Sequence, residues 1–256
     1  MSNPDLEKLY VERLRIKNPY EAIDQTKRAE SLRSTLWLIV NMVWIADYEP
    51  HSADQLTDFF GSVFDELGDE LDLKIDVPQL NLSTNEIAEI ERVDINSGLD
   101  VRQPMIFYVP KEIASQENRG YLPLMHPHIG FHSTLIPGND AKNVKDVSGW
   151  MVGESFKFPP LRGRDEEEWK AILEKDVRFG TPVLPTLNVY TVQALMYHLI
   201  SSGDNLDGKQ YYSYIPGTIM DEKPLLAAAT PGEGIFVFNF HSKYRDYGFR
   251  LTSVIQ

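Results

Sequence analysis

The chain changes character near residue 100, and this change constrains its fold more than any other feature. Before residue 100 the apolar residues recur at helical spacing; after it, prolines and glycines recur and the apolar runs shorten to strand length. Helices followed by strands are typical of α+β proteins. We therefore predict an α+β fold, with an acidic helical N-terminal part over 1–100. A β-rich part over 101–256 follows, with a mixed or antiparallel sheet and two interspersed helices. The boundary is soft, and one integrated domain is an alternative.

The clearest helical pattern follows Ser52. Ser52 and Gln55 have the spacing of a capping pair, and six apolar residues then recur along one face of a helix. These residues are Leu56, Phe59, Phe60, Val63, Phe64 and Leu67. The acidic residues of the same stretch fall outside this stripe. The pattern predicts an amphipathic helix with a buried phenylalanine face and an acidic outer face.

The other elements follow from apolar spacing, caps and turn residues. We predict helices over 4–16, 19–47, 84–92 and 188–201, with another opening near 165. Ser83 and Glu86 have capping spacing at the third of these. We predict strands over 104–109, 129–136, 150–158, 211–215, 234–240 and 247–255, the last two paired as a hairpin. In the last strand, Arg250 and Thr252 alternate with apolar residues, as in a half-buried strand.

Charge is concentrated in one segment. Residues 47–100 carry 2 basic and 15 acidic side chains, whereas the whole chain has a net charge of −13. Such a field disfavours nucleic-acid phosphates and anionic membranes, and it can attract a basic partner. A solvated acidic face is the alternative interpretation. The longest apolar run, 36–46, is far shorter than the ~20 residues of a membrane span.

The cysteine count and the first residues of the chain indicate in which cellular compartment we expect the protein. The chain has no cysteine, which excludes a disulfide framework, a thiolate metal site and a cysteine nucleophile. The first residues are polar and carry no apolar targeting run. We therefore expect a cytoplasmic or other intracellular location.

The best candidate for chemistry is a histidine cluster, His126, His128 and His132. On a strand, His126 and His128 face the same side about 6.7 Å apart and could share one iron, zinc or copper ion. His132 could join them if the chain bends at Gly130. On a helix, His128 and His132 would share a face instead, and the two geometries exclude each other. Partly buried histidines in a turn-prone segment are the alternative.

The same segment resembles the first motif of the cupin family. Its order is Gly120, His126, His128, His132 and Gly138, with a histidine where that family has glutamate. The hexapeptide HPHIGF is similar to a stretch of the pirins, a cupin branch that binds iron through two such histidines and a later histidine–glutamate pair. The following KDVSGWMVGES, residues 145–155, is loosely similar too, although no histidine lies near its glutamate. The resemblance implies a metal-dependent enzyme.

Other motifs predict no catalytic site. Residues 203–210 nearly spell a phosphate-binding loop, but glutamine replaces the required hydroxyl, and a helix precedes the motif where a strand is needed. We predict a tight polar turn there. The aromatic residues crowded between 211 and 249 could bind a ring, a sugar or a protein, or could be ordinary strand residues.

Two functional hypotheses follow. The leading one is a non-catalytic protein–protein interaction or structural, assembly component without a cofactor, whose partner is another protein or copies of itself. The alternative is a cupin-like metal-dependent enzyme with His126 and His128 as ligands of one Fe, Zn or Cu ion, completed by His132 or Glu154.

Overall fold

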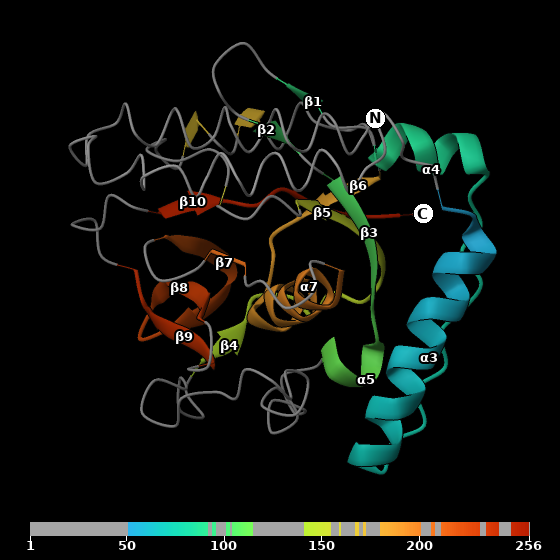
Figure 1. Cartoon of the computed structure of the whole chain (residues 1–256). Coiled ribbons are helices and arrows are strands. Elements are labelled where there is room, and N and C mark those ends of the chain that lie inside the picture. The colour runs from blue at the N-terminus through green and yellow to red at the C-terminus, as the bar shows by residue number, and fades with distance from the viewer. Residues whose placement is uncertain are drawn as a thin grey trace, which may run out of the picture. The chain divides into compact units, whose positions relative to one another are not determined.

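A computed structural model describes the chain over 51–91, 94–95, 101–102, 104–114, 141–154, 159, 167–168, 171–172, 180–200, 206–207, 211–230, 234–240 and 247–255 (Figure 1). The chain divides into two compact units. One comprises Met1–Glu49 and Val93–Val101, and the other comprises Pro50–Arg92 and Arg102–Gln256. Helices and sheets are both present, so the fold is α+β as predicted. β1 (Asp94–Ile95) and β2 (Val101–Arg102) form a two-stranded ribbon, and all other described elements belong to the larger unit.

A four-stranded antiparallel sheet has the order β3-β5-β11-β6. Its strands are β3 (Pro104–Val109), β5 (Gly149–Glu154), β11 (Thr252–Val254) and β6 (Thr181–Val183). Every residue of β3 is buried. β3 lies at one edge of this sheet, and both α4 (Thr84–Glu91) and α7 (Leu187–Ile200) contact it.

A five-stranded sheet has the order β10-β7-β8-β9, with β4 paired to β7. Its strands are β10 (Tyr247–Phe249), β7 (Tyr212–Met220), β8 (Lys223–Thr230), β9 (Gly234–Asn239) and β4 (Lys142–Asn143). β10 runs parallel to β7, and the other pairings are antiparallel. Asp221 and Glu222 make the tight β7–β8 turn, both with positive φ. α7 contacts strands of both sheets, so it forms the core between them (Figure 1).

Two residues explain an irregularity in β7. The β7–β8 register shifts between Ile215 and Ile219, around Pro216 and Gly217. Proline cannot donate to a strand ladder and is tolerated at such bulges. A Cβ atom on Gly217 would lie 2.5 Å from the backbone oxygen of Pro185, so the close approach of the chain before α7 requires glycine.

The predicted acidic helix is α3 (Ala53–Leu71), and its capping box of Ser52 and Gln55 is present. The predicted buried face is confirmed in part. Phe60 and Phe64 are buried and meet Trp150 and Tyr108 edge-on, with ring centroids 5.3 and 6.1 Å apart. Phe59, which the stripe includes, is 40% exposed instead. It lies at the border of the buried face, where a helical turn carries it away from the sheet.

The segment after α3 closes this side of the core. α3 ends at Asp72, whose left-handed conformation turns the chain back. The backbone oxygen of Pro78 accepts from Trp150 Nε1 at 2.9 Å, and the hydroxyl of Thr57 accepts from the amide of Leu80 at 3.1 Å. α3 and α4 thus share one apolar core with β3 and β5. The predicted domain boundary near residue 100 stays a prediction.

Several further predicted elements are confirmed with shifted ends. The strand predicted at 104–109 is β3, and those at 150–158, 211–215 and 234–240 are β5, β7 and β9. The helices predicted at 84–92 and 188–201 are α4 and α7, and Ser83 and Glu86 cap α4 reciprocally. The predictions for 4–16, 19–47 and 129–136 fall outside the described residues. Only 167–168 and 171–172 of the helix predicted from 165 are described, and they are helical. α5 (Lys111–Ala114) is an additional short helix.

One C-terminal strand is missing from the sequence prediction, and two predictions are wrong. The missed strand is β8, because its alanine run lacks the β-branched residues that signal a strand. The predicted hairpin of 234–240 with 247–255 does not form, because β9 pairs with β8 and β10 pairs with β7. The predicted last strand is two strands, and Arg250 and Thr252 are buried rather than on a solvent side. Among the described residues, no helix is long and apolar enough to cross a bilayer.

Candidate functional site

The chain passes from one sheet to the other at Arg250. β10 ends at Phe249 in the five-stranded sheet, and β11 begins at Thr252 in the four-stranded sheet. Arg250 lies between them and is 1% exposed. A guanidinium is always charged at biological pH, so its burial requires a counter-charge and hydrogen-bond acceptors. The structure supplies both.

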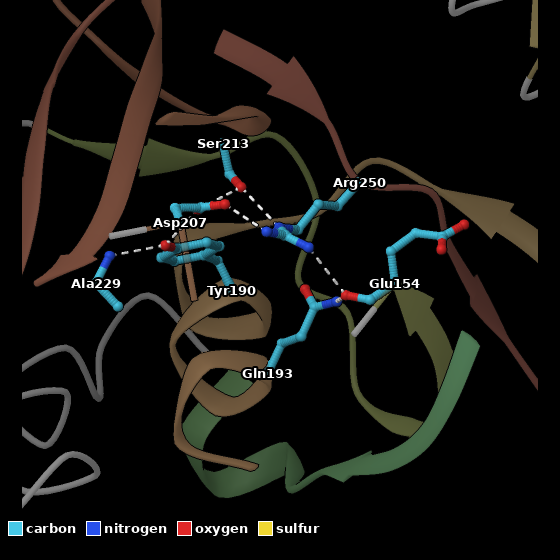
Figure 2. Close-up of polar contacts among 7 residues, drawn as sticks. All are labelled: Glu154, Tyr190, Gln193, Asp207, Ser213, Ala229 and Arg250. Carbon is cyan, nitrogen blue, oxygen red and sulfur yellow. Dashed lines mark hydrogen bonds and ion pairs between the residues drawn. The ribbon is translucent and has the colours of Figure 1, made fainter. Parts of the chain in front are cut away.

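Arg250 is bound on three sides (Figure 2). Its Nη2 pairs with Oδ1 of Asp207, which is fully buried. Its Nε donates to the Ser213 hydroxyl at 2.8 Å, and its Nη1 donates to the backbone oxygen of Glu154 at 3.2 Å. Ser213 lies on β7 and Glu154 ends β5, so one guanidinium connects the two sheets.

Asp207 is the second centre of this network. Its Oδ2 accepts from the Ser213 hydroxyl at 2.6 Å and from the Tyr190 phenol at 2.8 Å. The Tyr190 hydroxyl in turn accepts from the amide of Ala229 on β8 at 3.0 Å. Asp207 itself has a positive φ of 69° and forms a bridge with Ala229. α7, β7 and β8 are therefore tied together around one carboxylate.

Gln193 completes the connection between α7 and the four-stranded sheet. Its Nε2 donates to the same backbone oxygen of Glu154 at 2.6 Å. We call these six residues the buried network, in which Glu154 takes part through its backbone oxygen and the others through their side chains: Glu154, Tyr190, Gln193, Asp207, Ser213 and Arg250. All are at most 1% exposed. Their hydrogen bonds run from one element of the core to another, so the network can orient the two sheets but is closed to a dissolved substrate.

The electrostatics of the network follow from its burial. Burial raises the pKa of Asp207, and Arg250 and the hydrogen bonds from Ser213, Arg250 and Tyr190 oppose that rise. Burial, followed by the charge of Asp207, raises the pKa of Tyr190 well above its ordinary value. The phenol therefore keeps its proton and remains a donor to Asp207.

The predicted metal ligands are not brought together by the described part of the chain. His126, His128 and His132 all lie outside the described residues. Glu154, the other candidate ligand, is buried at the end of β5, and its backbone oxygen belongs to the buried network. The described residues contain no group of three side chains that could hold a metal ion. The histidine site stays a prediction.

The crowded aromatic residues pack against one another on one face of the five-stranded sheet. Tyr212 meets Phe238 with ring centroids 4.9 Å apart, and Tyr214 meets Phe240 at 5.1 Å. Tyr247 contacts both Phe240 and Tyr214. Tyr214 is buried, whereas the other four rings are partly buried. Cross-strand ring pairs of this kind stabilise a sheet.

Sequence reasoning missed the buried network. The turn predicted at 203–210 agrees with the positive φ of Asp207, but that residue is a buried counter-charge rather than part of an exposed turn. An arginine between two apolar residues in a predicted strand was the available signal. This signal could not identify Asp207, 43 residues away in the sequence, as the partner of Arg250.

Comparisons with known protein families, with curated proteins and with solved structures found no match. The similarity of residues 120–138 to the first cupin motif stays a resemblance of sequence.

Proposed function

We propose that this chain is a non-catalytic protein that binds a basic partner protein through the outer side of α3. The observation that carries the proposal is the exposed side of α3, where Asp54, Asp58 and Asp65 are exposed and Phe59 is 40% exposed beside them. No lysine or arginine lies in this helix. A structural or assembly role is the broader class to which such a protein belongs.

The charge arrangement of α3 supports binding because it is unfavourable for the helix by itself. Asp54 and Asp58 are four residues apart, and like charges at that spacing destabilise a helix by about 0.2–0.5 kcal/mol. No basic residue stands in the last turn, where it would favour the helix dipole. Asp58 and Asp65 are both exposed on this helix. A basic surface would neutralise them.

Phe59 offers an aromatic side chain that a partner can bury, which the carboxylates of α3 do not. Interfaces derive much of their affinity from aromatic residues that are buried on binding, with charges at the rim giving specificity and association rate. Phe59 borders the acidic side of α3, and its ring lies edge-on to that of the buried Phe60, with ring centroids 5.2 Å apart. A partner with an apolar pocket flanked by lysine or arginine fits this surface.

A second copy of the chain fits less well than a different protein. The chain has a net charge of −13, and the acidic segment carries the whole of that imbalance. Two copies would therefore approach with like charges. We accordingly favour a different, basic protein over self-association.

The test compares two pairs of charge removals. Asp58→Asn/Asp65→Asn removes two carboxylates from α3, and Asp221→Asn/Glu222→Gln removes two exposed ones from the β7–β8 turn. A protein retained by the immobilised wild-type chain is identified, purified and titrated calorimetrically against each variant. We expect the α3 pair to weaken binding at least about tenfold, and the control pair to leave it unchanged. Equal affinities, or no protein that distinguishes the wild-type chain from the α3 variant, would contradict the proposal.

A further inference from the structure

A glycine that the fold does not require lies in the middle of α3. Gly61 is helical, and glycine is the least favourable helix residue apart from proline. A Cβ atom on Gly61 would meet no described atom within 4 Å, apart from its neighbours in the helix. Gly68 differs, because a Cβ atom there would lie 2.5 Å from the backbone oxygen of Leu73. Packing therefore explains Gly68 but not Gly61.

The chain after α3 touches the helix on either side of Gly61. This segment runs back along α3 (Figure 1). The amide of Leu73 donates to the backbone oxygen of Gly68 at 2.9 Å, and the amide of Leu80 donates to the Thr57 hydroxyl at 3.1 Å. Gly61 is four residues after Thr57 and seven before Gly68, so all three lie on one side of the helix. Because Gly61 is partly exposed between these two contacts, another chain can reach the backbone of α3 there.

Two exposed carboxylates flank this open position. Asp58 and Asp65 lie three residues before and four residues after Gly61, so both neighbour it on the helix surface. They are seven residues apart, which is two helical turns or about 10.5 Å along the axis. A second helix presents side chains seven residues apart at the same distance on one face. On a strand, about 10 Å corresponds to three residues, and side chains three residues apart point to opposite faces. The spacing of the carboxylates therefore favours a helix as the binding element.

We propose that the basic partner binds α3 through an α-helix that comes closest at Gly61 and presents two lysines or arginines, seven residues apart, to Asp58 and Asp65. This inference rests on the proposed function and names the element of the partner that α3 recognises. The distance between packed helices depends on the side chains at their contact, so the missing side chain at Gly61 allows a close approach. The basic side chains then reach the carboxylates on either side of the contact.

The first experiment tests whether Gly61 serves the fold or an interface. Gly61→Ala and the control Ser62→Ala each introduce alanine, the best helix former, at neighbouring positions of α3. We expect both variants to raise the urea midpoint of the unbound chain. A lower midpoint for Gly61→Ala would overturn the proposal, because the fold itself would then require the glycine.

The second experiment uses two fluorescent, alanine-rich peptides of about 20 residues, long enough to form helices alone. They have the same composition, but one carries lysines seven residues apart and the other carries lysines five residues apart, on different faces. Anisotropy titrations at low salt measure their affinity for the full chain. We expect the first peptide to bind the wild-type chain at least about tenfold more tightly than the second. Equal affinities would overturn the proposal.

Substitutions in α3 then locate the contact. For the peptide with lysines seven residues apart, we expect Gly61→Ala to weaken binding several-fold and Gly61→Leu at least about tenfold, because each side chain keeps the peptide backbone away. Ser62→Ala adds no atoms and should change the affinity less than twofold. Weaker binding in Asp58→Asn/Asp65→Asn but wild-type binding in Gly61→Leu would overturn the helix contact and leave the proposed acidic surface standing.

Discussion

Replacing Arg250 by methionine tests the buried network most severely. Methionine fills much of the same volume but removes the charge and the donors to Asp207, Ser213 and the Glu154 backbone. Removing one member of a buried ion pair costs about 3–5 kcal/mol, because the other charge stays buried without its partner. Total stabilities of domains are about 5–15 kcal/mol. We therefore expect Arg250→Met to lose about a fifth or more of the unfolding free energy at pH 8.

The loss should depend on pH with a defined sign. Arg250 lowers the pKa of Asp207, so its removal raises that pKa further above the unfolded value. For an acid whose folded pKa is raised, stability is lost as pH rises from the unfolded pKa, about 4, through the folded pKa. The deficit of Arg250→Met relative to the wild-type chain is therefore smaller at pH 5 than at pH 8.

Urea denaturation at both pH values measures these free energies, with the slope against urea checked for constancy. Asp207→Asn/Arg250→Met removes the stranded carboxylate. We expect it to exceed Arg250→Met in stability by about 2 kcal/mol at pH 8 and to lose that advantage at pH 5. Arg250→Lys keeps the charge without the planar fork and should fall between wild type and Arg250→Met. A deficit below about 1 kcal/mol for Arg250→Met at pH 8, or one independent of pH, would refute the reasoning.

Three further predictions concern other groups. Tyr190→Phe leaves the buried amide of Ala229 without its acceptor, so urea titration should show a loss of about 1–3 kcal/mol in unfolding free energy. A variant as stable as the wild-type chain would contradict this role of Tyr190. Glu91 has a pKa raised from 4.5 to about 7, so its contribution to stability is lost as pH rises between these values. Glu91→Gln should therefore gain on the wild type above pH 7 by up to ~3 kcal/mol in urea titrations, whereas a constant difference from pH 5 to 8 would argue against the raised pKa. If His126 and His128 hold a metal, elemental mass spectrometry should find near-stoichiometric iron, zinc or copper in the wild-type chain and none in the doubly alanine-substituted variant; no metal in either folded protein would contradict the site.

The elements that the sequence predicted well are those determined by local patterns. α3 follows from a capping pair and a helical stripe within one stretch of chain, and both ends of β3 follow from an apolar run between turn residues. The predicted apolar stripe of α3 wrongly includes Phe59 in the buried face. Apolar periodicity identifies which face of a helix is buried, but not how much of that face the neighbouring sheet covers. The exposure of Phe59 depends on how α3 packs, since Phe60 and Phe64 are the residues of the stripe that meet Trp150 and Tyr108.

The candidate sites were less predictable because they depend on pairings distant in sequence. Asp207 and Arg250 come together only because β10 pairs with β7 and the chain then crosses to β11. The alternation of apolar and polar residues in the predicted last strand indicated that Arg250 faces solvent. Arg250 is buried instead, because the chain crosses there from one sheet to the other and has no solvent side. His51 and Glu91 likewise meet across the whole α3–α4 segment. No spacing rule reports such contacts.

The most direct measurement of the central claim, that the outer side of α3 binds a basic partner, is hydroxyl-radical footprinting of the chain with and without that partner. Phe59 and Leu184 are matched probes, because they are 40% and 39% exposed and lie on different elements. We expect binding to reduce the oxidation of Phe59 several-fold and to leave Leu184 unchanged, with the protection lost in Asp58→Asn/Asp65→Asn. Undiminished oxidation of Phe59 in the saturated complex would contradict the claim.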